Sequence, residues 1–146
     1  MKMHLFKHYY IANPDLYYLL YDELKISPQE MTLIYLYGDI GLGKTTLVRS
    51  FLKYLSISNS VTSPTFTLIN QYGGLSNPVY HYDMYRIKSP HELLEIGIDH
   101  YFNQKGLHFI EWPDRFESHL PTPDYKIYFH MLDNGRLIKI YKYYEK

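Results

Sequence analysis

Several stretches of the chain have the hydrophobic spacing of β-strands. Met31 to Tyr37 is a near-continuous apolar run, which is typical of a strand buried on both faces of a sheet. Tyr125 to Leu132 and Arg136 to Tyr143 flank Asp133-Asn134-Gly135, a turn sequence that predicts an antiparallel hairpin. Shorter apolar or alternating runs predict four more strands, at Met3 to Ile11, Phe66 to Tyr72, Val79 to Tyr85 and Leu107 to Ile110.

Three other stretches have helical spacing or helix-capping residues. Asn13 is a candidate N-cap, and the leucines that follow predict an amphipathic helix over Asp15 to Leu24. A second helix is predicted over Leu47 to Leu55, directly after a glycine-rich segment. A third is expected to start after Ser89 and to end or be interrupted at Gly97. Strands and helices in this order indicate an α/β protein.

The junction between the buried strand and the second helix carries a phosphate-binding motif. Gly38, Gly43, Lys44 and Thr45 fit G-x-x-x-x-G-K-[ST], the Walker A loop. Its glycines let backbone N–H groups surround phosphate oxygens, and the positive end of the next helix points at the same place. We expect Lys44 to contact the β- and γ-phosphates and Thr45 to bind Mg²⁺. The predicted nucleotide-binding loop comprises Gly38, Asp39, Ile40, Gly41, Leu42, Gly43, Lys44, Thr45 and Thr46.

Two other interpretations of this loop explain fewer of its residues. A glycine-rich turn that binds nothing has no need of Lys44 and Thr45 after its last glycine. A Rossmann dinucleotide site requires a third glycine, and Thr46 occupies that position. We therefore predict one P-loop NTPase-like α/β domain over residues 1–146. Its central sheet should be mixed and mainly parallel, with antiparallel parts at its ends, including the C-terminal hairpin.

Two acidic residues at strand ends could complete the site. Val79 to Tyr82 ends in Asp83, and Leu107 to Ile110 ends in Glu111. Because a parallel sheet collects its chemistry at the carboxyl ends of its strands, both acids are expected near the loop, where Mg²⁺ needs a second anchor. The alternative for each is a solvated acid at a strand end. With Lys44, these two residues are the candidate catalytic groups.

Other polar residues fit a nucleotide site less specifically. The hydroxyl-rich segment Thr62-Ser63-Pro64-Thr65-Phe66 could be a switch in which Thr65 contacts nucleotide, or an ordinary turn. His81 and His108 alternate with apolar neighbours, so we expect them in the core or behind the site rather than as ligands. A guanine-specific GTPase normally has an N-K-x-D stretch after a later strand. This sequence has none, which favours ATP.

Composition excludes several other functions. The formal net charge of zero argues against a broad electrostatic footprint for DNA or RNA. The chain has no cysteine, which excludes disulfides, thiolate nucleophiles and zinc–thiolate sites. No apolar run is long enough to span a membrane, and no signal-peptide pattern opens the chain, so we expect a cytoplasmic protein.

Five motifs, taken in order, resemble those of the TsaE (YjeE) family of bacterial ATPases. The first is the phosphate loop itself. The others are similar to the family's S-P-T-[FY]-x-L, H-x-D-x-Y-R, E-x-G-x-x-x-Y-F and I-E-W-P segments, and they lie at Ser63 to Leu68, His81 to Arg86, Glu95 to Phe102 and Ile110 to Pro113. The resemblance covers nearly the whole chain.

This resemblance implies roles for individual residues. Lys44 would hold phosphates, Thr45 and Glu111 would bind Mg²⁺, and Asp83 would position water or support the metal. Trp112 would lie beside the site, and Arg136 falls near a C-terminal family position that approaches the nucleotide. Leu42 departs from the small residue, usually alanine, that the family has between its last two loop glycines. Its backbone N–H remains available to phosphate.

The resemblance also implies a biological role. Family members hydrolyse ATP to support threonylcarbamoyl modification of adenosine in tRNA (t6A), acting on a complex of the TsaD and TsaB proteins and touching tRNA only indirectly. Two other functions remain open on the same loop. One is a small-molecule kinase, although the four arginines are scattered and form no evident lid. The other is a nucleotide-gated binding module with negligible hydrolysis.

Overall fold

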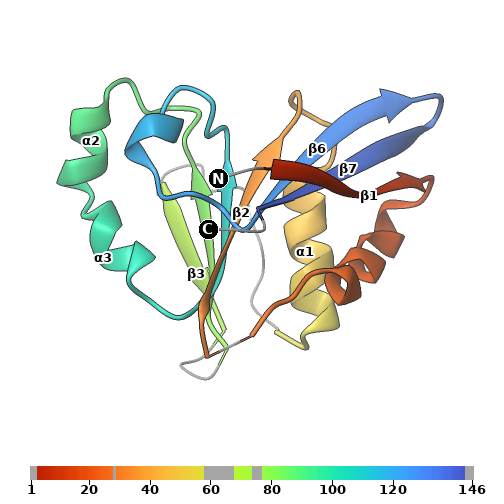
Figure 1. Cartoon of the computed structure of the whole chain (residues 1–146), viewed down its shortest axis with the longest axis horizontal. Helices are drawn as coiled ribbons and strands as arrows, with labels where there is room; N and C mark the ends of the chain where they lie inside the picture. Colours follow the sequence, from red (N-terminus) through yellow and green to blue (C-terminus); the bar gives the residue numbers. More distant parts are fainter. Residues whose placement is uncertain (1–2, 28, 58–67, 74–76, 144–146) are drawn as a thin grey trace.

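The computed structural model describes residues 3–27, 29–57, 68–73 and 77–143. Its strands form one mixed sheet in the order β1-β7-β6-β2-β5-β4-β3 (Figure 1). Every predicted strand has a counterpart, which confirms the α/β class. The strands are β1 (Met3–Ile11), β2 (Met31–Tyr37), β3 (Ile69–Tyr72), β4 (Val79–Asp83), β5 (Gly106–Glu111), β6 (Tyr125–Leu132) and β7 (Gly135–Tyr143).

The middle of the sheet is parallel and both ends are antiparallel, as predicted. β2 lies between β5 and β6 and pairs in parallel with both, and β4 continues the parallel part beside β5. β6 and β7, β1 and β7, and β3 and β4 pair antiparallel. Because β2, β4 and β5 run in the same direction, their carboxyl ends meet at one edge of the sheet, where chemistry collects in α/β proteins.

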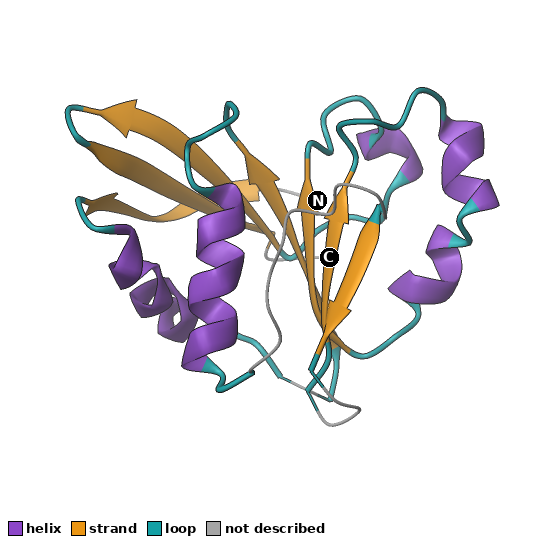
Figure 2. Ribbon diagram, turned by 180° about the vertical axis from the view of Figure 1, so that it is seen from behind, coloured by secondary structure: helices purple, strands orange, loops and turns teal. Residues whose placement is uncertain are grey.

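Helices cover the two faces of the sheet over different strands. α1 (Lys44–Tyr54) and the 3-10 helix η1 (Pro14–Glu23) lie on one side. α2 (Pro90–Glu95), α3 (Ile98–Phe102) and the short η2 (Glu117–His119) lie on the other (Figure 2). The sheet has one hydrophobic core on each face, and alternate residues of β2 belong to each. Ile34 and Leu36 pack toward α1, whereas Leu33 and Tyr35 pack toward α2 and α3. This double burial explains the unbroken apolar sequence of β2.

The first helix differs from the prediction in its type and in its buried face. Pro14–Glu23 is a 3-10 helix, in which residues three apart lie on the same side. Tyr17 and Leu20 are buried, whereas Leu16 and Leu19, which the α-helical spacing assigned to the core, are 39% and 49% exposed. The tighter winding therefore directs Tyr17 toward Gly43, in the loop after β2.

Several element boundaries also differ from the prediction. Asn13 does cap the first helix, since its side chain accepts the N–H of Asp15 at 3.0 Å. α1 begins at Lys44, three residues earlier than expected, because the chain enters the helix immediately after the loop glycines. β4 stops at Asp83. Gly97, with φ of 69°, separates α2 from α3, so it interrupts the predicted helix.

Candidate functional site

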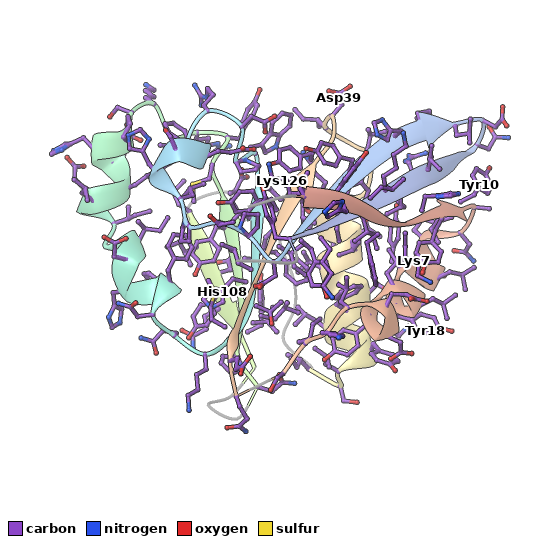
Figure 3. All side chains as sticks on the ribbon, in the orientation of Figure 1. Lys7, Tyr10, Tyr18, Asp39, His108 and Lys126 are labelled. Atoms are coloured by element: carbon purple, nitrogen blue, oxygen red, sulfur yellow. The ribbon has the colours of Figure 1, made fainter. Side chains whose placement is uncertain are left out.

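A cleft lies at the edge where the parallel strands end. It has a volume of about 360 Å³ and is bordered by the loop after β2, the start of α1 and the ends of β4 and β5. Figure 3 shows Asp39 of this loop at the rim of the molecule, far from the interior residue His108. The predicted site residues that line the cleft are Ile40, Gly41, Gly43, Lys44, Thr45, Thr46, Asp83, Glu111 and Trp112. Three separate segments of the chain thus meet there.

Both the backbone conformation and the packing at Gly43, the last glycine of the loop, require glycine. Its φ is 107°, in the region that favours glycine. A Cβ at this position would lie 2.7 Å from the hydroxyl oxygen of Tyr17, which η1 buries beside the loop. The N–H groups at the start of α1, an 11-residue helix, follow directly and give this end of the cleft a partial positive charge.

Lys44 is held inside the cleft. Its side chain is only 4% exposed, and its Nζ donates a hydrogen bond to the carbonyl of Gly38 at 2.5 Å. The same Nζ lies 3.6 Å from the centroid of the Trp112 ring, a cation–π contact. Burial lowers the pKa of Lys44, while the carboxylates of Glu111 and Asp83 oppose that shift.

Glu111, at the end of β5, is a buried carboxylate with partners from two elements. It is 5% exposed, and its Oε2 accepts a hydrogen bond from the Thr45 hydroxyl at 3.1 Å. The Nε2 of His81, on β4, contacts the same oxygen. Burial alone would raise the pKa of Glu111, but the hydrogen bond and charge of His81, with Lys44 and Thr45, hold the pKa below its usual value.

The oxygens of Thr45 and Glu111 fit Mg²⁺. Neighbouring oxygen ligands on an octahedral Mg²⁺ lie about 2.9 Å apart, since each is about 2.0–2.1 Å from the metal. The 3.1 Å between Thr45 Oγ1 and Glu111 Oε2 is close to that spacing. Within the described ranges, no three His, Cys, Asp or Glu side chains are grouped as a metal site. Mg²⁺ in proteins commonly takes further ligands from phosphate and water.

Asp83 faces the cleft from β4, in register with Glu111 on β5. Its Oδ1 accepts the backbone N–H of Tyr85 at 2.9 Å. Burial raises the pKa of Asp83, and the charge of Glu111 adds to the rise, although the Tyr85 N–H and the charges of His81 and Lys44 oppose it. The two neighbouring carboxyl groups therefore differ: the pKa of Asp83 is raised and that of Glu111 is lowered.

Arg136 lies on β7 and reaches the phosphate loop from the side of β2 opposite to β4. Its Nε donates to the carbonyl of Leu42 at 3.0 Å, and its Nη2 to the carbonyl of Gly41 at 3.4 Å. The sequence predicted that Arg136 approaches a nucleotide, and the structure brings it to the backbone of the loop. Because these carbonyls bond Arg136, the loop is tied to the C-terminal hairpin.

Trp112 directly follows Glu111 and has a strained backbone. Its φ of 59° lies in the left-handed region, which is unfavourable for a bulky residue. This conformation places the indole against Lys44, and its ring centroid lies 5.0 Å from that of Tyr85. Trp112 lines the cleft, and the strain marks this turn as a candidate functional feature.

Two residues of the site, Tyr17 and Tyr85, were missed by the sequence analysis. His81 was expected in the core or behind the site, but its contact with Glu111 was not predicted. The contact of His81 with Glu111 requires the register of β4 against β5, which no local pattern encodes. Tyr17 is adjacent to Gly43 because η1 winds as a 3-10 helix. Tyr85 lines the cleft just after Asp83, where its place in the family-like segment His81 to Arg86 was the available signal.

Thr65 and its hydroxyl-rich segment lie outside the described residues, so the predicted switch stays a prediction. In the ranges that the structure does describe, none of the helices has both the length and the apolar character needed to cross a membrane.

Comparisons with known proteins identify relatives across most of the chain. The family model described as Threonylcarbamoyl adenosine biosynthesis protein TsaE matches residues 14–138. The tRNA threonylcarbamoyladenosine biosynthesis protein TsaE of Haemophilus influenzae is 37% identical over 117 residues, covering 80% of this chain and 74% of the relative. The protein of the same name from Bacillus subtilis is 42% identical over 84 residues, or 58% and 52% of the two chains. The crystal structure of Bacillus subtilis YdiB superposes with a TM-score of 0.74 at 28% identity, covering 97% of this chain and 86% of YdiB.

Proposed function

The chain belongs to the TsaE family, and we propose that it is a Mg²⁺-dependent ATPase that supports the threonylcarbamoyl modification of adenosine in tRNA (t6A). The tRNA-modification part follows from the family model and the named relatives. One observation carries the ATPase part. The phosphate loop, the paired oxygens of Thr45 and Glu111, and the carboxyl group of Asp83 border the same cleft.

In this proposal the loop binds the phosphates of ATP. The N–H groups around Gly43 and at the start of α1 would surround the phosphate oxygens, and Lys44 would leave the Gly38 carbonyl to contact the β- and γ-phosphates. Moving the ammonium to phosphate is favourable because its present hydrogen-bond acceptor is a neutral carbonyl, whereas a phosphate oxygen is charged. Arg136 would keep the loop in shape through Leu42.

Thr45 and Glu111 would hold Mg²⁺. A Mg²⁺ held by these residues would supply positive charge to the transferred phosphoryl group. Glu111 suits this role because its lowered pKa keeps it ionised and ready to bind a cation at neutral pH. Asp83, at the neighbouring strand end, would accept a hydrogen bond from the attacking water or support the metal. Trp112 would cover one side of the bound phosphates.

The partners in this proposal are the TsaD and TsaB proteins. Hydrolysis of ATP would reset their complex between turnovers, with tRNA contacted only indirectly. We place the protein in the cytoplasm, where tRNA is modified. The neutral overall charge supports the indirect contact, because direct tRNA binding draws on a broad basic surface.

The test is phosphate release from ATP by the purified protein, alone and with a TsaD–TsaB complex. Lys44→Ala should weaken ATP binding, and Glu111→Ala should abolish Mg²⁺-dependent hydrolysis while leaving some binding. The matched controls are Lys53→Ala, on an exposed part of the same helix, and Glu30→Ala, also on the surface. Both controls should hydrolyse ATP at the wild-type rate.

Three results would contradict this assignment in different ways. Normal hydrolysis by Glu111→Ala would move the metal role to Asp83. Phosphorylation of an acceptor without release of free phosphate would identify a kinase. Absence of hydrolysis both alone and with TsaD–TsaB would leave a nucleotide-gated binding module.

A further inference from the structure

Two fully buried histidines on neighbouring strands differ in their hydrogen bonding. The Nδ1 of His108 accepts the hydroxyl of Tyr82 at 2.6 Å, and its Nε2 donates to the carbonyl of Gln104 at 3.0 Å. His81 contacts Glu111 through Nε2, whereas its Nδ1 finds no hydrogen-bond partner in the part of the chain that the structure describes. His108 is therefore fully satisfied as a core residue, and His81 is not.

The unpaired nitrogen of His81 lowers the stability of the fold, so packing alone does not explain a histidine at this position. Leaving a buried polar atom without a partner destabilises the folded protein. The cross-strand neighbour of His81 is Phe109, and Val79 precedes it on the same face of β4, so an apolar side chain would suit these surroundings. The polar contact that the structure gives His81 is the one with Glu111. A function of the contact with Glu111 would explain why a destabilising histidine stands here.

The sheet fixes the imidazole of His81 firmly against Glu111. β4 is bonded to β3 on one side and to β5 on the other, so its backbone cannot shift independently. Asp83 pairs with Glu111, and alternation puts His81, two residues earlier, on the same face. His81 thus approaches the Glu111 carboxylate from the sheet, while Thr45 approaches it from α1.

Binding of a metal would change the two hydrogen bonds to Glu111, from Thr45 and from His81, in different ways. If Thr45 and Glu111 bind the same Mg²⁺, the Thr45 hydroxyl oxygen turns to the metal and its hydrogen bond to the carboxylate is lost. The N–H of His81 comes from β4, contacts the same oxygen Oε2 and can remain bonded. Groups that hold a metal ligand in this way typically contribute about 10–100-fold to metal affinity.

We propose that His81 is a positioning residue that holds the Glu111 carboxylate in the orientation in which it and Thr45 bind Mg²⁺. This inference rests on the proposed function of the site. It assigns His81 no contact with nucleotide. Its removal should therefore weaken the binding of metal and leave the metal-independent affinity for nucleotide intact.

The test separates these two affinities. ADP binding is measured by isothermal titration calorimetry in the presence of EDTA. Mn²⁺ binding to the protein–ADP complex is measured by electron paramagnetic resonance, from the signal of free Mn²⁺. In His81→Phe, which keeps a buried ring but has no N–H, ADP affinity without metal should stay within about twofold, and Mn²⁺ affinity should fall about 10–100-fold. His81→Gln, whose amide reaches the position of Nε2, should restore most of the loss.

Further variants guard against a general effect on folding. His108→Phe removes the other buried histidine, on the opposite face of the sheet, and should leave Mn²⁺ affinity unchanged. If His81→Phe does not fold, His81→Asn replaces it, because the shorter amide cannot reach Glu111. Wild-type Mn²⁺ affinity in His81→Phe or His81→Asn would overturn the inference. Failure of the wild-type protein–ADP complex to bind Mn²⁺ would instead overturn the metal site of the proposed function, and the role of His81 with it.

Discussion

His108 should make the protein less stable as the pH falls below neutrality. The imidazole is fully buried and nearly parallel to the rings of Tyr80 and Tyr82, with centroid distances of 4.5 and 5.7 Å. Its Nε2 donates to the Gln104 carbonyl and its Nδ1 accepts from Tyr82, so both nitrogens are engaged in the neutral form. Burial lowers the pKa of His108 from 6.5 to about 4.

The size of the effect follows from proton linkage. Between pH 6.5 and about 4 the unfolded chain binds a proton at His108 that the folded protein does not bind, so the free energy of unfolding falls as the pH falls. Each pKa unit corresponds to about 1.4 kcal/mol, which gives a loss of about 3 kcal/mol across this window. Above pH 6.5 both states are neutral and His108 contributes no pH dependence.

The assay is urea unfolding followed by circular dichroism, from about pH 7 down to about pH 4.5, for the wild type and His108→Gln. Glutamine keeps a donor and an acceptor but cannot titrate, so the free energy of unfolding of the variant should fall less steeply with acid. His119→Gln, at an exposed histidine, controls for the substitution itself and should follow the wild type. If the free energy of unfolding falls with acid by the same amount in the wild type and in His108→Gln, the reasoning is refuted.

Two further predictions concern the phosphate loop. Gly43→Ala forces a Cβ to within 2.7 Å of the Tyr17 hydroxyl at a φ of 107°, so it should destabilise the protein by about 1–3 kcal/mol and weaken ADP binding. Gly41→Ala, which has a positive φ but open space, should be milder in thermal unfolding and ADP titrations; equal effects would contradict the role of Tyr17. Arg136→Met frees the carbonyl of Leu42 and should weaken ADP binding about tenfold, a loss of about 1.4 kcal/mol, with unchanged dependence on Mg²⁺. An ADP affinity equal to that of the wild type, measured by calorimetry, would show that the loop keeps its shape without Arg136.

Local sequence patterns predicted the parts of the fold that depend on local chemistry. The apolar run at Met31–Tyr37 indicated a doubly buried strand, because only such a strand has no polar face. The loop glycines with Lys44 and Thr45 predicted the turn between β2 and α1, and phosphate binding by this turn stays a prediction. The Asp133-Asn134-Gly135 turn predicted the C-terminal hairpin, and this hairpin is confirmed as β6 and β7.

The features that the sequence did not reveal depend on packing between distant segments. Leucine spacing suggested an α-helix after Asn13, but tertiary contacts wind this segment as a 3-10 helix and bury Tyr17 in place of its leucine neighbours. The contact between His81 and Glu111 exists only in one register of β4 against β5. Arg136 meets the loop because β7 and β2 are separated by a single strand, an order that the sequence does not specify.

The most direct test of the central claim is a crystal structure of the protein with Mg²⁺ and a non-hydrolysable ATP analogue. We expect the phosphates against the loop N–H groups and Lys44, with Thr45 Oγ1 and a Glu111 oxygen bound to the same Mg²⁺. The hydrogen bond between Thr45 and Glu111 should then be replaced by the metal. A metal bound by Asp83 while Thr45 still donates to Glu111, or phosphates bound away from Lys44, would contradict the account.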